Sequence, residues 1–206
     1  MEIHAPHGAI RSLKEFFLHI FIVTVGILIA LSLEGLREAR HEHRLVHDAR
    51  SSFHTELLAN QKNLNLELTN VKQQKQIIAN ILNDLPQLEK DPKEFAARVS
   101  KVQPSFYYFA TSSWESALSS GALTHMDRSE TDRLAAAYLQ TRSYQEIEKE
   151  ALPVWFSLES YFQRRRSFGP HEVSDGIEKL QMMALYESTM EHVGNELSGG
   201  LRDALN

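Results

Sequence analysis

Residues 16–33 read FFLHIFIVTVGILIALSL, and this run decides how the rest of the chain is arranged. It is apolar on every side of a helix, and none of its residues carries a fixed charge. Eighteen residues at 1.5 Å each give about 27 Å, close to the roughly 30 Å hydrocarbon thickness of a bilayer. The sequence therefore predicts a transmembrane helix over residues 16–34. Residues about one turn apart along this span are Phe16, Ile20, Val23, Gly26, Ala30 and Leu33.

Two other interpretations of this run compete with a membrane span. The apolar core of a cleaved signal peptide has about 7–15 residues, which is shorter, although Ala30-Leu31-Ser32 is compatible with a cleavage site. A helix buried in a soluble core would need apolar surroundings, and little else in the chain is apolar enough to supply them. The span, with lipid as its partner, is the prediction that fits the run best.

The residues that flank the span bear on its orientation. Lys14 and one arginine precede it, whereas Arg37, Arg40 and Arg44 follow it among acidic residues. Counting Lys and Arg alone favours a cytoplasmic C-terminal side. The acidic neighbours lie at i, i+3 and i, i+4 spacing, which indicates a solvated helix surface. Because a short tail before a long domain more often stays inside, we expect a cytoplasmic N-terminus and a periplasmic domain.

The remaining composition is that of a folded domain. Of 206 residues, 42% are hydrophobic and 24% are charged, and Gly and Pro are few, which favours long helices. The net charge of -5 argues against nucleic acid as a partner. The absence of cysteine excludes disulfides and thiolate metal sites.

A long helix should continue from the span into the domain, because no proline occurs between Pro6 and Pro86. From Leu57 the apolar positions alternate by three and four residues, which is typical of a helix with a narrow seam. Gln61 and Lys75 interrupt this seam, so packing within one domain explains it better than an isolated coiled coil. Its apolar members are Leu57, Leu64, Leu68, Val71, Ile78, Leu82 and Leu85.

Turn and cap residues divide the rest of the chain. Asp91-Pro92 predicts the start of a short helix, and Ser112 or Ser113 should cap another that ends at Gly121. Asp127-x-x-Glu130 predicts the start of a long helix that continues through a kink at Pro153. A last helix should begin at Ser174.

Together these signals predict an all-α protein in which an N-terminal transmembrane helix continues into an up-and-down helical bundle. The expected segments are a tail over 1–15, the span over 16–34, the bundle over 35–198 and a frayed C-terminus over 199–206.

Candidate chemistry is sparse. His41, His43, His47 and His54 cluster after the span, and His43 and His47 share a helix face as two metal ligands would. The His-Glu-x-x-His pattern of zinc proteases is absent, so a titrating helix surface explains them better, with metal binding or pH sensing left open. Glu146, Glu148 and Glu150 are interpreted as solvated surface. We predict no catalytic residues, no cofactor and no enzymatic activity.

Two stretches resemble a family of uncharacterised bacterial single-span membrane proteins. The first is Val25-Gly26-Ile27-Leu28-Ile29-Ala30-Leu31 with Glu56-Leu57-Leu58-Ala59-Asn60 downstream. The second, from Trp114 to Leu123, is similar to the pattern Trp-x-x-Leu-x-x-Ser-Gly-x-Leu, with Ala117 in place of its first Leu and Tyr138 as the tyrosine that follows. The resemblance covers roughly residues 16–140 and implies a bacterial inner-membrane anchor with a helical domain, but no activity. In physical terms Trp114 and Tyr138 are expected core anchors and Gly121 a helix stop.

The leading functional hypothesis is a membrane-anchored interaction or scaffold protein that binds a protein partner or a second copy of itself. Gly26 and Ala30 would let a second span approach closely, so self-association through this face is open. One alternative is a ligand-sensing domain that signals through a partner, since aromatic residues are numerous. Another is an accessory subunit of a membrane enzyme.

Overall fold

The computed structural model describes residues 13–163 and 170–206. Within these ranges it contains six α-helices, one 3-10 helix and no strand, so the predicted all-α fold is confirmed. Residues 1–12 of the expected tail lie outside the described part.

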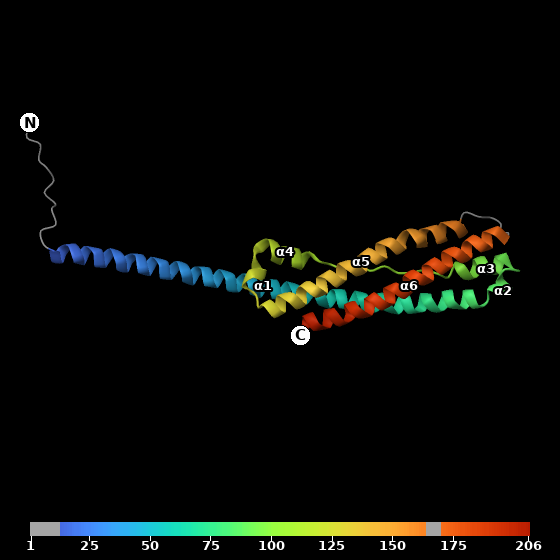
Figure 1. The fold of residues 1–206 in the computed structure, drawn as a ribbon, viewed down its shortest axis with the longest axis horizontal. Helices are drawn as coiled ribbons and strands as arrows, with labels where there is room; N and C mark the ends of the chain where they lie inside the picture. Colours follow the sequence, from blue (N-terminus) through green and yellow to red (C-terminus); the bar gives the residue numbers. More distant parts are fainter. Residues whose placement is uncertain (1–12, 164–169) are drawn as a thin grey trace, which may run out of the picture.

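Helix α1 spans Leu13–Asn83 and has 71 residues, which makes it about 106 Å long. Its N-terminal part projects far beyond the bundle (Figure 1), and the first buried side chain along it is Val46. Near its N-terminus α1 has a stretch long and apolar enough to cross a membrane, none of it buried inside the structure. A helix buried in a soluble core is therefore the wrong interpretation of this stretch.

At the far end of the bundle the chain turns through two short helices, α2 (Leu85–Leu88) and α3 (Pro92–Val99). The Asp91 carboxylate accepts a hydrogen bond from the Glu94 N–H at 3.1 Å and caps α3, as the sequence predicted. The chain then returns along α1 as an extended segment, residues 102–111, which has no helical turns.

The part of α1 between the apolar run and the bundle, residues 33–46, is called the stalk. Near the stalk the chain forms α4 (Ser112–Ser120) and the 3-10 helix η1 (Ala122–His125). Gly121 joins them at a φ of 76°, the left-handed region that favours glycine, so the predicted helix stop is confirmed. Helix α5 spans Arg128–Gln163 and continues through Pro153. The Asp127 carboxylate caps it, accepting from the N–H groups of Ser129 and Glu130 at 2.8 and 3.2 Å.

Helix α6 spans Pro170–Leu205 and begins four residues before the expected start at Ser174. The expectation that residues 199–206 fray was wrong, because α6 stays helical to Leu205. Leu197 and Leu201 are fully buried in the same cluster as Phe53, and this packing holds the last turns in place.

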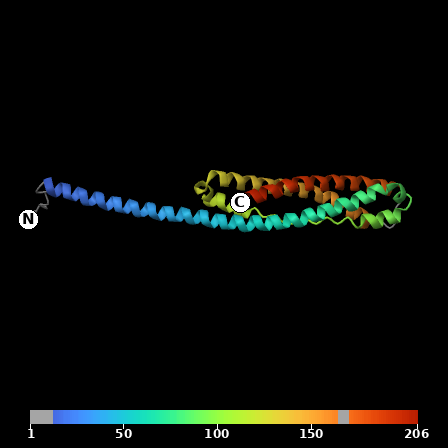
Figure 2. The same cartoon turned by 90° about the horizontal axis from the view of Figure 1, so that it is seen from below.

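The topology is up-and-down, with one pass that is not a helix. Helices α1 and α5 run in the same direction, and α6 runs back between them and packs against both (Figures 1 and 2). The return between α3 and α4 is made by the extended segment, which lies along α1. Three long helices and one extended segment thus take the four places of a bundle.

Two clusters of buried side chains form the core. The proximal core, on the stalk side, includes Phe53, Leu57, Leu64, Phe109, Tyr138, Tyr144, Leu197 and Leu201. The distal core includes Ile78, Ile81, Phe95, Leu158, Leu180 and Met183. Of the predicted seam, Leu57, Leu64, Leu68, Val71 and Ile78 are buried, whereas Leu82 and Leu85 are half-buried against the distal core.

Two glycines of α6 provide a matched test of the packing. A Cβ at Gly194 would lie 2.6 Å from Leu68 Cδ2 and 3.0 Å from Tyr144 Cε2, whereas a Cβ at Gly199 would meet nothing within 4 Å. We expect Gly194→Ala to lower the free energy of unfolding by about 1–3 kcal/mol, because overpacking outweighs its helix propensity. Gly199→Ala should raise it by about 0.5–1 kcal/mol. Denaturant unfolding measures both; equal gains would contradict the close approach of α6 to α1.

Candidate functional site

A row of polar side chains on α1 binds the backbone of the extended segment. Asn60 makes two of these bonds: its Oδ1 accepts from the Ala110 N–H at 2.9 Å and its Nδ2 donates to the Ala110 carbonyl at 2.8 Å. One turn further, Asn63 Nδ2 donates to the Tyr108 carbonyl at 2.8 Å. The backbone of the segment is therefore satisfied by side chains instead of by a strand.

The row continues towards the far end of α1. Glu67 Oε2 accepts from the Tyr107 N–H at 3.3 Å, and Asn70 Oδ1 accepts from the Ser105 N–H at 2.8 Å. Gln74 Oε1 accepts from the Gln103 N–H at 2.9 Å. We call these five α1 side chains the polar ladder: Asn60, Asn63, Glu67, Asn70 and Gln74.

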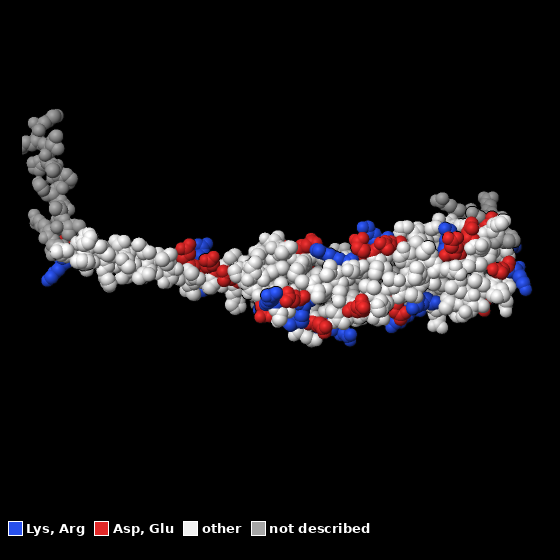
Figure 3. Space-filling view, viewed as in Figure 1, with Lys and Arg blue, Asp and Glu red and all other residues white. Residues whose placement is uncertain are grey.

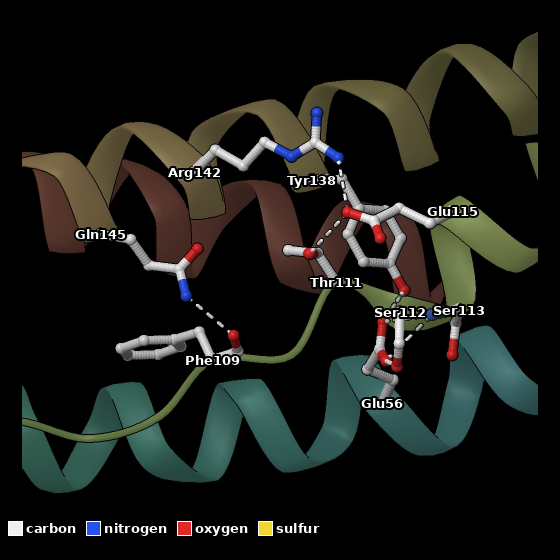
Figure 4. Close-up of polar contacts among 9 residues, drawn as sticks. All are labelled: Glu56, Phe109, Thr111, Ser112, Ser113, Glu115, Tyr138, Arg142 and Gln145. Carbon is white, nitrogen blue, oxygen red and sulfur yellow. Dashed lines mark hydrogen bonds and ion pairs between the residues drawn. The ribbon is translucent and has the colours of Figure 1, made fainter.

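The two partners match in length. Residues 60–74 of α1 span about 21 Å at 1.5 Å per residue, and residues 103–110 span about 23 Å at 3.3 Å per extended residue. Helix α1 and the extended segment run in opposite directions, so successive ladder residues pair with backbone groups that lie progressively earlier in the segment. On the other side of the segment, Gln145 of α5 donates to the Phe109 carbonyl at 2.8 Å (Figure 4). The segment is thus held between α1 and α5.

Glu56, one turn before the ladder, ties α4 and α5 to α1 (Figure 4). Its carboxylate, only 9% exposed, accepts from the Ser112 hydroxyl at 2.7 Å and the Tyr138 hydroxyl at 2.7 Å. The Ser113 N–H donates to both carboxylate oxygens at 3.1 and 3.2 Å. Burial and the neighbouring Glu56 carboxylate raise the pKa of Tyr138.

This network corrects one sequence-based expectation. Ser112 and Ser113 were expected to cap α4 with their own side chains, but the N-cap is Thr111, which makes no side-chain cap bond. Glu56 takes over that role from another helix, and its negative charge suits a helix N-terminus. Outside the network, Glu115 accepts from Arg142 at 3.2 Å and joins α4 to α5.

A second group of polar side chains is buried inside the bundle, on α1, α5 and α6. Glu67, Tyr144, Glu148 and Glu187 are 0%, 0%, 8% and 1% exposed. We call these four residues the acid cluster. Among the described residues, Glu67 Oε1, the Tyr144 hydroxyl, Glu148 Oε1 and both Glu187 oxygens have no hydrogen-bond partner. The interpretation of Glu148 as solvated surface was therefore wrong.

The surroundings of the cluster disfavour negative charge. Burial, followed by the Glu148 carboxyl, raises the pKa of Glu67, and burial raises the pKa of Glu148. Burial raises the pKa of Glu187 to about 7, with Lys75 opposing. Burial and the nearby carboxyl groups raise the pKa of Tyr144. Lys75 itself pairs with Glu191 at 2.6 Å.

The structure brings three expected anchor residues together. The Trp114 ring lies 5.6 Å from the Tyr138 ring and 6.3 Å from the Phe53 ring, measured between centroids, at the stalk end of the proximal core. Gly121 ends the helix that carries Trp114. These residues hold α4 against α1 and α5.

Other expected residues lie apart from this interior. His41, His43, His47 and His54 are exposed on α1, and His47 Nδ1 lies 3.3 Å from its neighbour Asp48. In the described ranges no three or more His, Asp or Glu side chains are grouped so as to hold a metal ion. The span residues Phe16, Ile20, Val23, Gly26, Ala30 and Leu33 are all exposed on the projecting part of α1.

Neither the polar ladder nor the acid cluster was predicted from the sequence. One signal was available: Asn60, Glu67 and Gln74 recur every seven residues beside the apolar seam, with Asn63 and Asn70 repeating the pattern one turn on. A polar row with the period of a helix interface indicates that the helix faces backbone groups instead of apolar side chains. Nothing in the sequence marked Glu187 or Glu148 as buried.

No family model, curated protein or solved structure matches the chain. The likeness of Trp114–Leu123 to a single-span bacterial family therefore stays a prediction.

The ladder can be tested with two asparagines of α1. Asn60→Ala leaves the N–H and C=O groups of the half-buried Ala110 without their partner, so we expect the free energy of unfolding to fall by about 1–3 kcal/mol. Asn65→Ala, on the exposed face of the same helix, should change it by less than about 0.5 kcal/mol. Thermal and denaturant unfolding measure the difference. Equal effects of the two variants would show that the ladder does not hold the segment.

Proposed function

We propose that the chain is a single-pass membrane protein whose helical bundle is a rigid platform for a protein partner. The observation that carries this proposal is the continuity of α1, one helix that includes the exposed apolar stretch and also forms a wall of the bundle core. A domain built on such a helix is fixed to its anchor without a flexible linker.

The stalk gives the platform a defined height. From Leu33, the end of the apolar run, to Val46, the first buried residue, α1 advances about 20 Å. Figure 3 shows the apolar run free of Lys, Arg, Asp and Glu, followed by charged side chains where the stalk begins. Glu42 contacts His125 of η1 at 3.6 Å, so the bundle starts at the end of the stalk.

Polar contacts inside the bundle hold its surface elements in place. This supports a binding role, because a surface that is already ordered loses less entropy on association. The polar ladder and Glu56 fix the extended segment and α4 to the long helices. Near the Arg142–Glu115 ion pair two large apolar side chains face solvent, Leu118 of α4 at 63% exposure and Leu139 of α5 at 68%. We propose this region as a contact for the partner.

We further propose that the N-terminus is cytoplasmic, that the bundle is periplasmic, and that the membrane is a bacterial inner membrane. The acidic residues interleaved with Arg37, Arg40 and Arg44 support a solvated position for the stalk outside the membrane.

The anchor and its orientation can be tested together, since the chain has no cysteine of its own. The full, uncleaved chain should stay in the membrane pellet after an alkaline carbonate wash. A single cysteine at the exposed position Ser116 should react with a membrane-impermeant maleimide in spheroplasts, whereas one at Lys14 should react only after permeabilisation. An uncleaved chain in the supernatant would refute the anchor, and the opposite labelling pattern would reverse the orientation.

The partner surface can be tested by photo-crosslinking in native membranes. A photoreactive amino acid at Leu139 should give a discrete crosslinked product, which Leu118→Glu should reduce at least about tenfold by placing a charge in the contact. The same probe at Lys62, exposed on α1, is the control and should give no such product. A monomer that crosslinks at neither position would contradict the platform, and a product containing a membrane enzyme complex would assign the chain as its accessory subunit.

One cavity favours ligand sensing as a second candidate function. It has a volume of about 290 Å³, lies between α3 and α5, and is lined by Val99, Val102, Trp155 and Leu158 with Gln103 at its polar side. This size is near the lower end for small-molecule sites, and the mixed lining suits a small amphipathic ligand. A compound that raises the unfolding temperature of the wild type but not of Trp155→Ala would support it.

A further inference from the structure

The carboxyl groups of the acid cluster are buried, and their surroundings do not compensate for the negative charge that they would carry when ionised. Three carboxyl groups, on Glu67 of α1, Glu148 of α5 and Glu187 of α6, lie in the interior of the bundle with at most 8% exposure. An ionised carboxylate without partners in such a place costs far more free energy than folding can supply, so the group takes up a proton instead. The cluster has to be neutral for the bundle to close.

The charged groups that face the cluster do not neutralise it. Helix α1 contributes Lys75, whose positive charge acts on Glu187, but the Lys75 ammonium lies 2.6 Å from the Glu191 carboxylate of α6 and is already paired. Helix α5 contributes the Tyr144 hydroxyl beside Glu148. The extended segment contributes the Tyr107 N–H, which donates to Glu67. This donor occupies one of the cluster's carboxyl oxygens.

The buried hydroxyl of Tyr144 gives a second reason to expect protonated carboxyl groups in this interior. Its side chain is 0% exposed, its ring packs edge-on to Phe109 at 5.5 Å, and its hydroxyl has no partner among the described residues. Negative charge on any of the three carboxyl groups would raise the pKa of this hydroxyl further. A hydroxyl and neutral carboxyl groups can donate to and accept from one another, whereas ionised carboxylates only accept and repel.

We propose that Glu67, Glu148 and Glu187, together with Tyr144, form an internal proton-binding site that joins α1, α5 and α6, and that loss of its protons opens the middle of the bundle. Opening separates the three helices where Glu67 also holds the extended segment. The ligand of this site is the proton alone. The raised pKa values of the three carboxyl groups agree with this assignment.

The sign of the pH dependence follows from the site. A glutamate in the unfolded chain loses its proton near pH 4.3, whereas the folded bundle keeps its protons to higher pH. The folded state therefore binds more protons, and its stability falls as the pH rises from about 5 towards 9. Stability is greatest where the site is fully protonated.

The test uses the full chain in detergent micelles and follows thermal unfolding between about pH 6 and pH 9. We expect the unfolding temperature of the wild type to fall by about 5 °C or more over this range. Gln is isosteric with Glu and cannot ionise, so Glu67→Gln, Glu148→Gln and Glu187→Gln should each flatten the slope, and their combination should remove most of it. Glu146→Gln, exposed on α5 two residues from Glu148, should leave it unchanged.

Infrared spectroscopy gives a second readout that does not depend on the stability of variants. At neutral pH the wild type should show the carbonyl band of protonated carboxylic acid, and the band should weaken in each cluster variant but persist in Glu146→Gln. The proposal would be overturned if the wild type lacked this band at neutral pH. It would also be overturned if the unfolding temperature of the combined variant fell with pH as steeply as that of the wild type. Recovery of stability at alkaline pH on addition of sodium, potassium, magnesium or calcium would also overturn it, by assigning a cation to the site.

Discussion

A peptide backbone that packs against helices without helix or strand partners of its own has to find hydrogen bonds for its N–H and C=O groups, and the rest of this structure depends on how that is done. Residues 102–111 cross the length of the bundle in an extended conformation. Five side chains of α1 and Gln145 of α5 supply the partners for this segment. The fourth place of the bundle is thereby filled by a strip of chain that α1 and α5 hold from both sides.

The ladder also fixes the register of the fold. Asn60 grips both backbone groups of Ala110, and Gln74 grips Gln103 at the other end, so a shift of one residue would break every bond between them. The same register places the Phe109 ring against Tyr144 and leaves Ser112 and Ser113 within reach of Glu56. The position of α4 is therefore a consequence of the bonds that precede it along the chain.

Signals that act over a few residues were predictable from the sequence. Asp91 with Pro92, Gly121, and Asp127 with Glu130 each use local cap or turn chemistry, and each sits where the sequence placed it. The apolar seam identified the buried face of α1 as far as Ile78. The ladder was not predictable, because its hydrogen-bond partners lie 29–50 residues apart. The acid cluster was not predictable either, because the burial of Glu67 and Glu187 depends on three helices meeting. The end of α6 was misjudged for the same reason, because contacts of Leu197 and Leu201 with distant residues keep it helical.

With its apolar stretch in a bilayer, as proposed above, the continuous helix α1 would turn the whole bundle about a point in the membrane. Beyond Leu33 the helix extends for about 75 Å to Asn83, so a tilt of roughly 10° in the lipid would sweep its far end sideways by about 13 Å. Small changes in bilayer thickness, or in how a neighbouring span leans, would be magnified at α2 and α3. The far tip would report mechanically on events inside the lipid, with no joint along α1 to absorb them.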